Sequence, residues 1–203
     1  METLFKRNRE WAAGVREEDP HYFDALRDQQ SPRYFWIGCA DSRVPANVVA
    51  GLAPGEVFVQ RNVANVVHSS DLNLLSTLEY AVEVLQVTHV IVCGHYGCGG
   101  VKASTEDYPK GLADHWLQPI RRLALLHAEE LGRAVSEKAR LDRLAELNVI
   151  EGVRRVSETP ILRRAWGRGQ DISVHGLIYG LHDGLLRDLG CSVRWKPTAP
   201  PEG

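Results

Sequence analysis

The sequence has no marked excess of one charge and no long hydrophobic run. Its 203 residues include 24 Lys and Arg against 26 Asp and Glu, a net charge of −2. A nucleic-acid-binding protein would carry a basic excess, so we expect no nucleic-acid partner. No apolar run approaches the ~18 residues of a membrane span, and the charged residues 1–11 do not resemble a secretory signal. We therefore expect a cytoplasmic protein with no membrane partner.

Cysteine is also scarce, with four in the whole chain. Disulfide-stapled domains are short and cysteine-dense, so a pair of structural disulfides is the less favoured interpretation. Cys93 lies inside an apolar run and, like Cys191, fits a small core side chain. Cys39 and Cys98 differ, because each follows a glycine where a strand is expected to end.

The length and the 44% hydrophobic content suit one α/β domain. We expect a single domain over residues 1–203, with a helical arm at 1–30 and a flexible, proline-rich tail at 197–203.

Hydrophobic patterning predicts strands that alternate with helices. Residues 34–37 form a continuous apolar run, which is typical of a strand buried on both faces of a parallel sheet. Asp71 can cap a helix whose apolar stripe is Leu72, Leu75, Leu78, Val82 and Leu85. The same reasoning predicts strands at 56–59, 89–93, 172–179 and 185–188, and helices at 1–18, 20–29, 117–127 and 137–156, with a turn or kink near Pro160.

This order predicts an α/β fold with a mostly parallel open sheet, flanked by helices, and a C-terminal hairpin at its edge. Ligands bind such sheets at the carboxyl ends of the strands. Cys39 follows the first buried strand and His95 follows the third. If those strands are neighbours, both side chains lie at the same rim.

Cys39, His95 and Cys98 together form a candidate Zn²⁺ site. Two thiolates and an imidazole suit zinc, and three protein ligands leave a fourth position open, as in catalytic sites. A structural zinc would need a fourth protein ligand, for which His68 could serve.

Asp41 and Arg43 directly follow the first candidate ligand. Two thiolates neutralise most of the charge of zinc, so a water molecule there is acidified less than at a three-histidine site. Asp41 could orient that water by accepting a hydrogen bond, and Arg43 could hold the carboxylate bidentately and keep it ionised. The alternative is an ordinary surface ion pair of little energetic value.

Several segments taken together resemble the β-class carbonic anhydrases. They are Cys39-Ala40-Asp41-Ser42-Arg43-Val44, Pro54-Gly55-Glu56, Arg61-Asn62-Val63-Ala64-Asn65 and His95-x-x-Cys98-Gly99-Gly100. The resemblance implies reversible hydration of CO₂ to bicarbonate and a proton, with one Zn²⁺ per chain held by Cys39, His95 and Cys98 and an Asp41–Arg43 dyad beside it. It also implies a homodimer or a dimer of dimers, whose N-terminal arms pack on the neighbouring chain. By the same matching, Gln30 and Phe58 line the substrate pocket from the dimer interface.

The sequence further resembles the bicarbonate-regulated (type II) subtype of that family. In this subtype the aspartate equivalent to Asp41 can swing onto zinc and close the site. Trp36, Arg61 and Tyr179, with the backbone near Val44, match the residues of its second bicarbonate pocket. Trp36 also has an ordinary interpretation as a core aromatic residue beside a strand end.

Two alternatives remain open. A hydrolase of CS₂ or COS could use the same zinc chemistry, because those molecules are also electrophilic at carbon. A non-catalytic, zinc-stabilised scaffold or sensor is the other, although it would have no use for Asp41 and Arg43. No dedicated proton shuttle is evident; the candidates are His68, His89 and His115.

Overall fold

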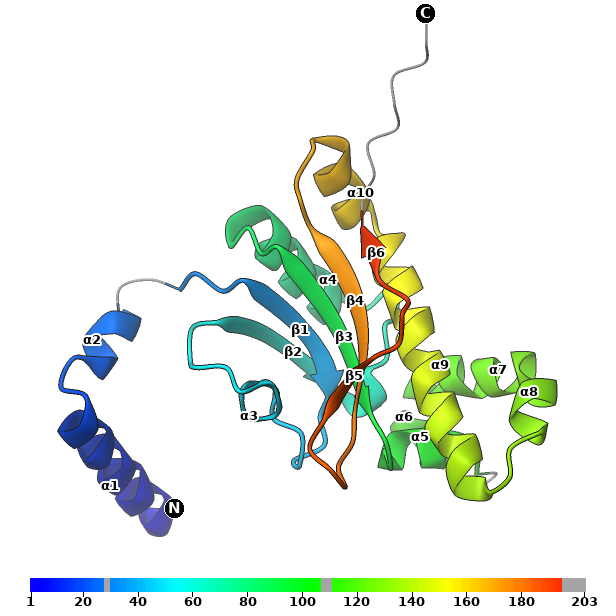
Figure 1. Cartoon of the computed structure of the whole chain (residues 1–203), viewed down its shortest axis with the longest axis horizontal. Helices are drawn as coiled ribbons and strands as arrows, with labels where there is room; N and C mark the ends of the chain where they lie inside the picture. The colour runs from blue at the N-terminus through cyan, green and yellow to red at the C-terminus, as the bar shows by residue number, and fades with distance from the viewer. Residues whose placement is uncertain (28–29, 107–110, 195–203) are drawn as a thin grey trace, which may run out of the picture. The chain divides into compact units, whose positions relative to one another are not determined.

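The computed structural model describes residues 1–27, 30–106 and 111–194 (Figure 1). The chain forms two compact units, residues 1–31 and 32–203. The first contains helices α1 (Glu2–Glu18) and α2 (Tyr22–Arg27), as predicted. The Trp11 ring packs edge-on against Phe23, with 5.8 Å between centroids. The predicted tail at 197–203 lies outside the described residues.

The second unit is built on a six-stranded sheet in the order β2-β1-β3-β4-β5, with β6 also paired to β4. Strands β1 to β4 are parallel, and β5 and β6 run antiparallel to β4. The predicted fold class is therefore confirmed, including the antiparallel strand at the edge. The strands are β1 (Tyr34–Cys39), β2 (Val57–Asn62), β3 (His89–His95), β4 (Ser173–Tyr179), β5 (Leu186–Asp188) and β6 (Val193–Arg194).

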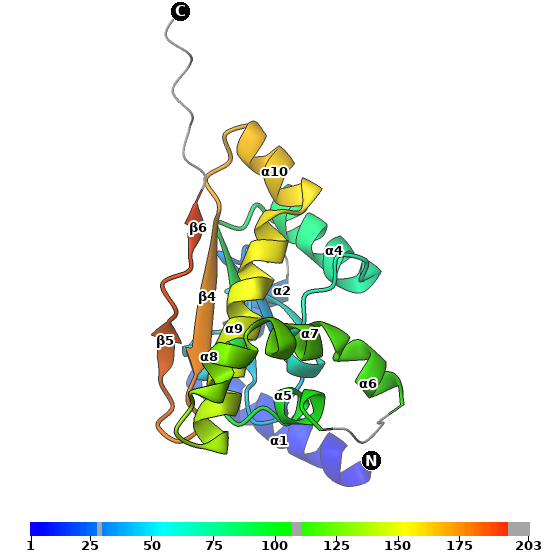
Figure 2. The same ribbon diagram turned by 90° about the vertical axis from the view of Figure 1, so that its right-hand side faces the viewer.

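Side chains on both faces of β1 are buried, which explains its unbroken apolar run. Phe35 and Ile37 belong to a large core cluster that also contains apolar residues of α9 (Glu137–Ser157). Figure 2 shows α9 running along this side of the sheet. Trp36 points to the other face and joins a small cluster with Ala46 of α3 (Ala46–Ala50). Because successive side chains of a strand point to opposite faces, alternate residues of β1 contribute to two different clusters, one on each face of the sheet.

The helix predicted after Asp71 forms, but its apolar stripe was partly wrong. Asp71 accepts a hydrogen bond from the Asn73 backbone and caps α4 (Leu72–Glu79), which continues into a π-helical turn η2 (Tyr80–Val84). Leu72 is 78% exposed, whereas Leu74 is fully buried. At 3.6 residues per turn, two residues apart lie on nearly opposite sides of a helix, so only one of the two can face the core.

The two long C-terminal helical predictions are confirmed. Gln118–Leu126 forms α7 with Pro119 in its first turn, and α9 ends just before Thr159. Thr159 then caps a new helix, α10 (Pro160–Gly167). Pro160 starts this helix rather than breaking it, because proline is favoured at the first helical position. Elements of three to six residues give no readable period, and the short ones escaped prediction for that reason: α3, α5 (Gly99–Ser104), α6 (Leu112–Trp116), α8 (Ala128–Gly132) and the 3₁₀ turn η1 (Val63–Asn65). Within the described ranges, no helix combines the length and the apolar character that crossing a membrane requires.

Candidate metal centre

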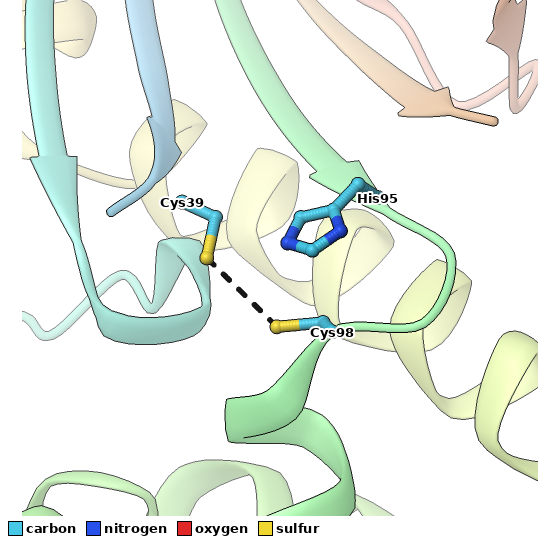
Figure 3. Close-up of side chains that lie close together, drawn as sticks. All are labelled: Cys39, His95 and Cys98. Carbon is cyan, nitrogen blue, oxygen red and sulfur yellow. Dashed lines mark hydrogen bonds between the residues drawn. The ribbon is translucent and has the colours of Figure 1, made fainter. Parts of the chain in front are cut away.

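The parallel pairing of β1 with β3 brings the candidate metal ligands to one rim of the sheet. Gly38 lies opposite Cys93 in this register, so Cys39 and His95, the last residues of the two strands, end within one residue of each other. Cys98 follows at the N-cap of α5 (Figure 3). The intervening Gly97 has a φ of 68°, a left-handed conformation that glycine adopts without strain and that turns the chain back toward the rim.

The geometry of the three side chains fits a tetrahedral metal ion. All three residues are buried, and their ligand atoms lie within 4.8 Å of one another. The Cys39 and Cys98 sulfurs are 3.8 Å apart. Two sulfurs that each lie ~2.3 Å from a tetrahedral Zn²⁺ would be separated by about 3.8 Å. The thiol pair is therefore spaced as a zinc ion requires.

The histidine presents one nitrogen to the site. His95 Nδ1 lies 3.1 Å from the Tyr96 carbonyl oxygen, which accepts a hydrogen bond and thereby assigns the proton to Nδ1. His95 Nε2 is buried and has no hydrogen-bond partner among the described residues. A buried polar atom without a partner is costly, whereas a metal ion would satisfy it.

The two thiols also call for a cation. A hydrogen bond from the Cys98 thiol lowers the pKa of Cys39. The interaction with Cys39, together with burial, raises the pKa of Cys98. Adjacent buried thiolates repel, so both ionise only when a cation shares the site. Cys93 plays no such part, because burial raises the pKa of its thiol and the thiol donates to the Gly94 carbonyl oxygen. All four cysteines carry free thiols, which agrees with the low weight given to disulfides.

Asp41 and Arg43 form a bidentate pair at the edge of this group. Arg43 Nε lies 2.9 Å from Asp41 Oδ1, and an Arg43 terminal nitrogen lies 2.6 Å from Oδ2. This guanidinium holds the pKa of Asp41 well below its usual range. The Asp41 side chain is only 16% exposed, and its Oδ2 lies 3.7 Å from His95 Nε2. The carboxylate is thus ionised beside the position that a metal ion would occupy.

Arg61 holds the backbone on which both Cys39 and Asp41 stand. Its Nε donates to the Cys39 carbonyl oxygen at 2.8 Å, and a terminal nitrogen donates to the Asp41 carbonyl oxygen at 2.5 Å. Arg61 lies opposite Gly38 in the β1–β2 register. This arginine therefore links the candidate ligand and the candidate base from a neighbouring strand.

Trp36, Arg61 and Tyr179 lie near the same rim. They stand on β1, β2 and β4, in register positions that share one face of the sheet. The Trp36 indole covers Gly38 so closely that a methyl group there would lie 2.5 Å from the indole nitrogen. Val44 is buried in the other cluster, with Cys39 and Cys98, and its backbone N–H donates to the Asp41 carbonyl oxygen.

Phe58 is not brought to the metal group of its own chain. Gln30 is exposed and belongs to the N-terminal unit, residues 1–31. Phe58 lies opposite Phe35 in β1, four residues before Cys39 or roughly 13 Å along the strand. Its ring packs against those of Phe35 and Tyr80, with centroids 5.9 and 5.8 Å away.

The histidines outside the centre have other surroundings. His68 hydrogen-bonds the Trp116 carbonyl oxygen and does not belong to the metal group, so it does not serve as a fourth ligand. His89 is hydrogen-bonded to His175, and His115 is exposed on α6. The pattern of residue types did not reveal Asn148, a buried amide on α9 that donates to the Ala64 carbonyl oxygen, because an isolated asparagine carries no sequence signal.

Comparison with known proteins decides the family. Residues 34–186 match the family model of the carbonic anhydrases. The chain belongs to the β-carbonic anhydrase family. A carbonic anhydrase from Emericella nidulans is 46% identical over 188 residues, which cover 93% of this chain and 82% of that protein.

Solved β-carbonic anhydrases share the fold as well as the sequence. One of two tetrameric enzymes from Sordaria macrospora superposes with a TM-score of 0.90 at 39% identity, over 95% of this chain and 98% of that one. The Coccomyxa enzyme in complex with acetazolamide superposes with a TM-score of 0.87 at 43% identity, over 92% and 85% of the two chains. The enzyme class expected from the sequence is confirmed.

Proposed function

We propose that this carbonic anhydrase catalyses the zinc-dependent, reversible hydration of CO₂ to bicarbonate and a proton. The observation that carries the proposal is the convergence of two sulfurs spaced for zinc and an unpartnered His95 Nε2, next to an ionised Asp41. When bound by Cys39, His95 and Cys98, zinc would supply a Lewis acid that makes water a stronger nucleophile at neutral pH.

The surrounding residues would orient that water. Asp41 would accept a hydrogen bond from this water molecule and so orient the water oxygen lone pair toward the CO₂ carbon. Arg43 keeps Asp41 ionised and fixed through its two hydrogen bonds. Arg61 holds the backbone of Cys39 and Asp41, so the base keeps its position relative to the ligands. The proton released in the reaction passes to buffer.

The test is zinc content together with stopped-flow CO₂ hydration. We expect about one zinc per chain in the wild type. Asp41→Ala should keep the zinc and lose roughly 10²-fold or more in kcat, the usual contribution of a positioned base. Asp171→Ala, which removes an exposed acid that pairs with Arg194, is the matched control and should keep full activity. Wild-type turnover in Asp41→Ala would favour a structural zinc or another base.

Parallel assays with CS₂ and COS separate the competing hydrolase. If the enzyme turned over CS₂ or COS faster than CO₂, the hydrolase would be the favoured function instead.

We further propose that bicarbonate regulates the enzyme, as in the type II subtype. The support is the common face of Trp36, Arg61 and Tyr179 and the direct link from Arg61 to the Asp41 backbone. Bicarbonate beside these side chains would favour a closed state in which Asp41 leaves Arg43 and becomes a zinc ligand. Activity should therefore be low below neutral to mildly alkaline pH and should be inhibited by bicarbonate.

Trp36→Ala should weaken bicarbonate inhibition without loss of zinc. Gly38→Ala is a second variant with the same expected direction, because its methyl group displaces the indole. Steady-state hydration at several bicarbonate concentrations measures both. A flat pH profile without a bicarbonate effect in the wild type would rule out this regulation.

A homodimer or a dimer of dimers is proposed as the active assembly. The Sordaria macrospora relatives are tetrameric, and Phe58 of one chain lies away from the metal group of the same chain. In the proposed assembly Phe58 and Gln30 line the pocket from the dimer interface. Location in the cytoplasm remains a prediction, which cell fractionation would test.

A further inference from the structure

The segment from Asn62 to Val66, here called the Asn62–Val66 loop, contains two consecutive non-glycine residues in left-handed conformation. The φ angles are 61° at Ala64 and 45° at Asn65, and both residues are buried. L-amino acids other than glycine rarely adopt this conformation, and it persists only where the surroundings enforce it. Such strain often occurs at functional sites.

The loop is tied directly to the Cys39 segment. Asn62 lies opposite Cys39 in the β1–β2 register, and its carbonyl oxygen accepts a hydrogen bond from the Ala40 backbone at 2.7 Å. The Asn62 side chain closes the loop by bonding both the N–H and the carbonyl oxygen of Val66. The start of the loop is thus hydrogen-bonded to the segment that carries Cys39, the first candidate metal ligand.

The same loop packs against the segments that carry the other two ligands. A methyl group on Gly94, the residue before His95, would lie 3.4 Å from Asn65 Oδ1. A methyl group on Gly100, two residues after Cys98, would lie 2.8 Å from the Ala64 Cβ. The loop therefore contacts the chain on either side of the metal group at close range.

Asn148 of α9 holds the strained residue from outside the loop. Its side chain is 4% exposed, and its Nδ2 donates to the Ala64 carbonyl oxygen at 2.8 Å. The adjacent Val149 packs beside Gly94. A helix of 21 residues in the core thus braces the loop and the His95 segment together.

We propose that Asn148 is a positioning residue for the metal centre: its amide holds Ala64 in the left-handed conformation and so keeps Cys39, His95 and Cys98 convergent. This inference rests on the proposed zinc site. Loss of the amide lets the loop relax, and the spacing of the ligand segments that pack on it changes. Removal of partners that orient metal ligands typically costs 10- to 100-fold in affinity, so we expect a loss of about that size.

The experiment measures zinc dissociation constants of the full-length protein by competition with a chromophoric chelator. Asn148→Ala should raise the dissociation constant about 10- to 100-fold. Asn148→Leu keeps the volume without the donor and should give the same loss if the alanine variant folds poorly. Val156→Ala is the matched control, because it truncates a fully buried side chain on the same helix without removing the hydrogen bond to the loop; its zinc affinity should stay at the wild-type value.

A rescue variant separates positioning from general destabilisation. Glycine adopts positive φ without strain, so in an Ala64→Gly background the loss of Asn148 should cost less than about threefold in zinc affinity. Cobalt substitution adds a spectroscopic readout: Asn148→Ala should shift the thiolate-to-cobalt charge-transfer and d–d bands, and Val156→Ala should not.

Wild-type zinc affinity in Asn148→Ala and Asn148→Leu would overturn the inference while leaving the proposed function intact. So would an equal loss of affinity in Val156→Ala, or an equal loss in the Ala64→Gly background. A wild-type chain that binds no zinc would overturn the proposed function and this inference with it.

Discussion

At the scale of single residues, the position of a charged pair matters more than its presence. Lys6 and Glu10 form an ion pair on α1, but both side chains are more than half exposed, and such pairs contribute little. Asp41 also pairs with a cation, yet its carboxylate is largely buried and lies beside His95 Nε2. The same kind of ion pair therefore lies beside the candidate metal group in one place and in open solvent in the other.

A histidine pair offers a second residue-scale feature. His89 Nδ1 and His175 Nε2 lie 3.0 Å apart, and His175 Nδ1 lies 3.1 Å from Ser192 Oγ. A hydrogen bond between the two rings requires one of them to be neutral. Burial lowers the pKa of both, and the charge of His175 lowers that of His89 further. The charged groups that influence the pair are Arg33, Arg194, Asp171 and Asp188.

We predict that this pair makes the protein less stable at acidic pH. The folded-state pKa values lie below the unfolded value of about 6.5, so the unfolded chain binds more protons and the unfolding free energy falls as the pH drops through that range. The measurement is urea unfolding at about pH 7.5 and about pH 5.5 for the wild type and for His175→Gln. The variant should lose less stability on acidification; an equal loss in both would contradict the prediction.

At the scale of elements, helix caps separate the segments of the C-terminal half. Thr159 Oγ1 accepts a hydrogen bond from the Leu162 backbone at 3.3 Å and so begins α10 immediately after α9 ends. The α10 residues Ile161, Leu162, Ala165 and Trp166 are all buried. The cap therefore fixes the direction from which a buried helix enters the core.

Thr159→Ala should reduce the unfolding free energy by about 1 kcal/mol, the usual effect of removing an N-cap side chain. The zinc content and CO₂ hydration rate should stay unchanged, because α10 contributes no residue to the metal group. Urea denaturation measures the first quantity and metal analysis the second. Unchanged stability would show that the Leu162 N–H finds another acceptor.

Prediction from sequence succeeded for elements with a strong local signal. The apolar runs of β1 and β3 and the capped start of α4 could be read from residue types alone. The short helix α5 could not, although Cys98 lies at its N-cap. Six residues do not define a helical period, and the close packing of Gly100 on Ala64 is a contact between distant parts of the chain that no local pattern records.

At the scale of the whole molecule, the N-terminal unit carries exposed apolar side chains. Leu4, Phe5 and Trp11 are each more than half exposed on α1, and no α1 side chain is buried. Exposed apolar residues gathered on one helix are typical of surfaces that contact another protein. If the arm packs on a second copy of the chain, as the sequence predicts, that copy would cover these exposed side chains.

Deletion of residues 1–31 should convert the predicted oligomer to a monomer. The variant should also lose most CO₂ hydration activity, because the proposed pocket takes Gln30 from the interface. Size-exclusion chromatography with light scattering measures the mass. Deletion of residues 197–203 is the control and should leave the number of chains in the oligomer unchanged. If the variant that lacks residues 1–31 kept the wild-type oligomer, the prediction would be contradicted.

The residue types alone predicted the chemistry of the candidate site: Cys39, His95 and Cys98 as candidate zinc ligands, and Asp41 with Arg43 beside them. Residue identity sets which groups can bind a metal or share a proton, and neighbours along the chain remain neighbours in space. Only the tertiary structure decided that β1 and β3 are adjacent, that the two sulfurs are 3.8 Å apart, and that Asn148 braces the strained Ala64 across 84 residues of sequence. Those facts depend on packing between distant segments, which no local pattern records.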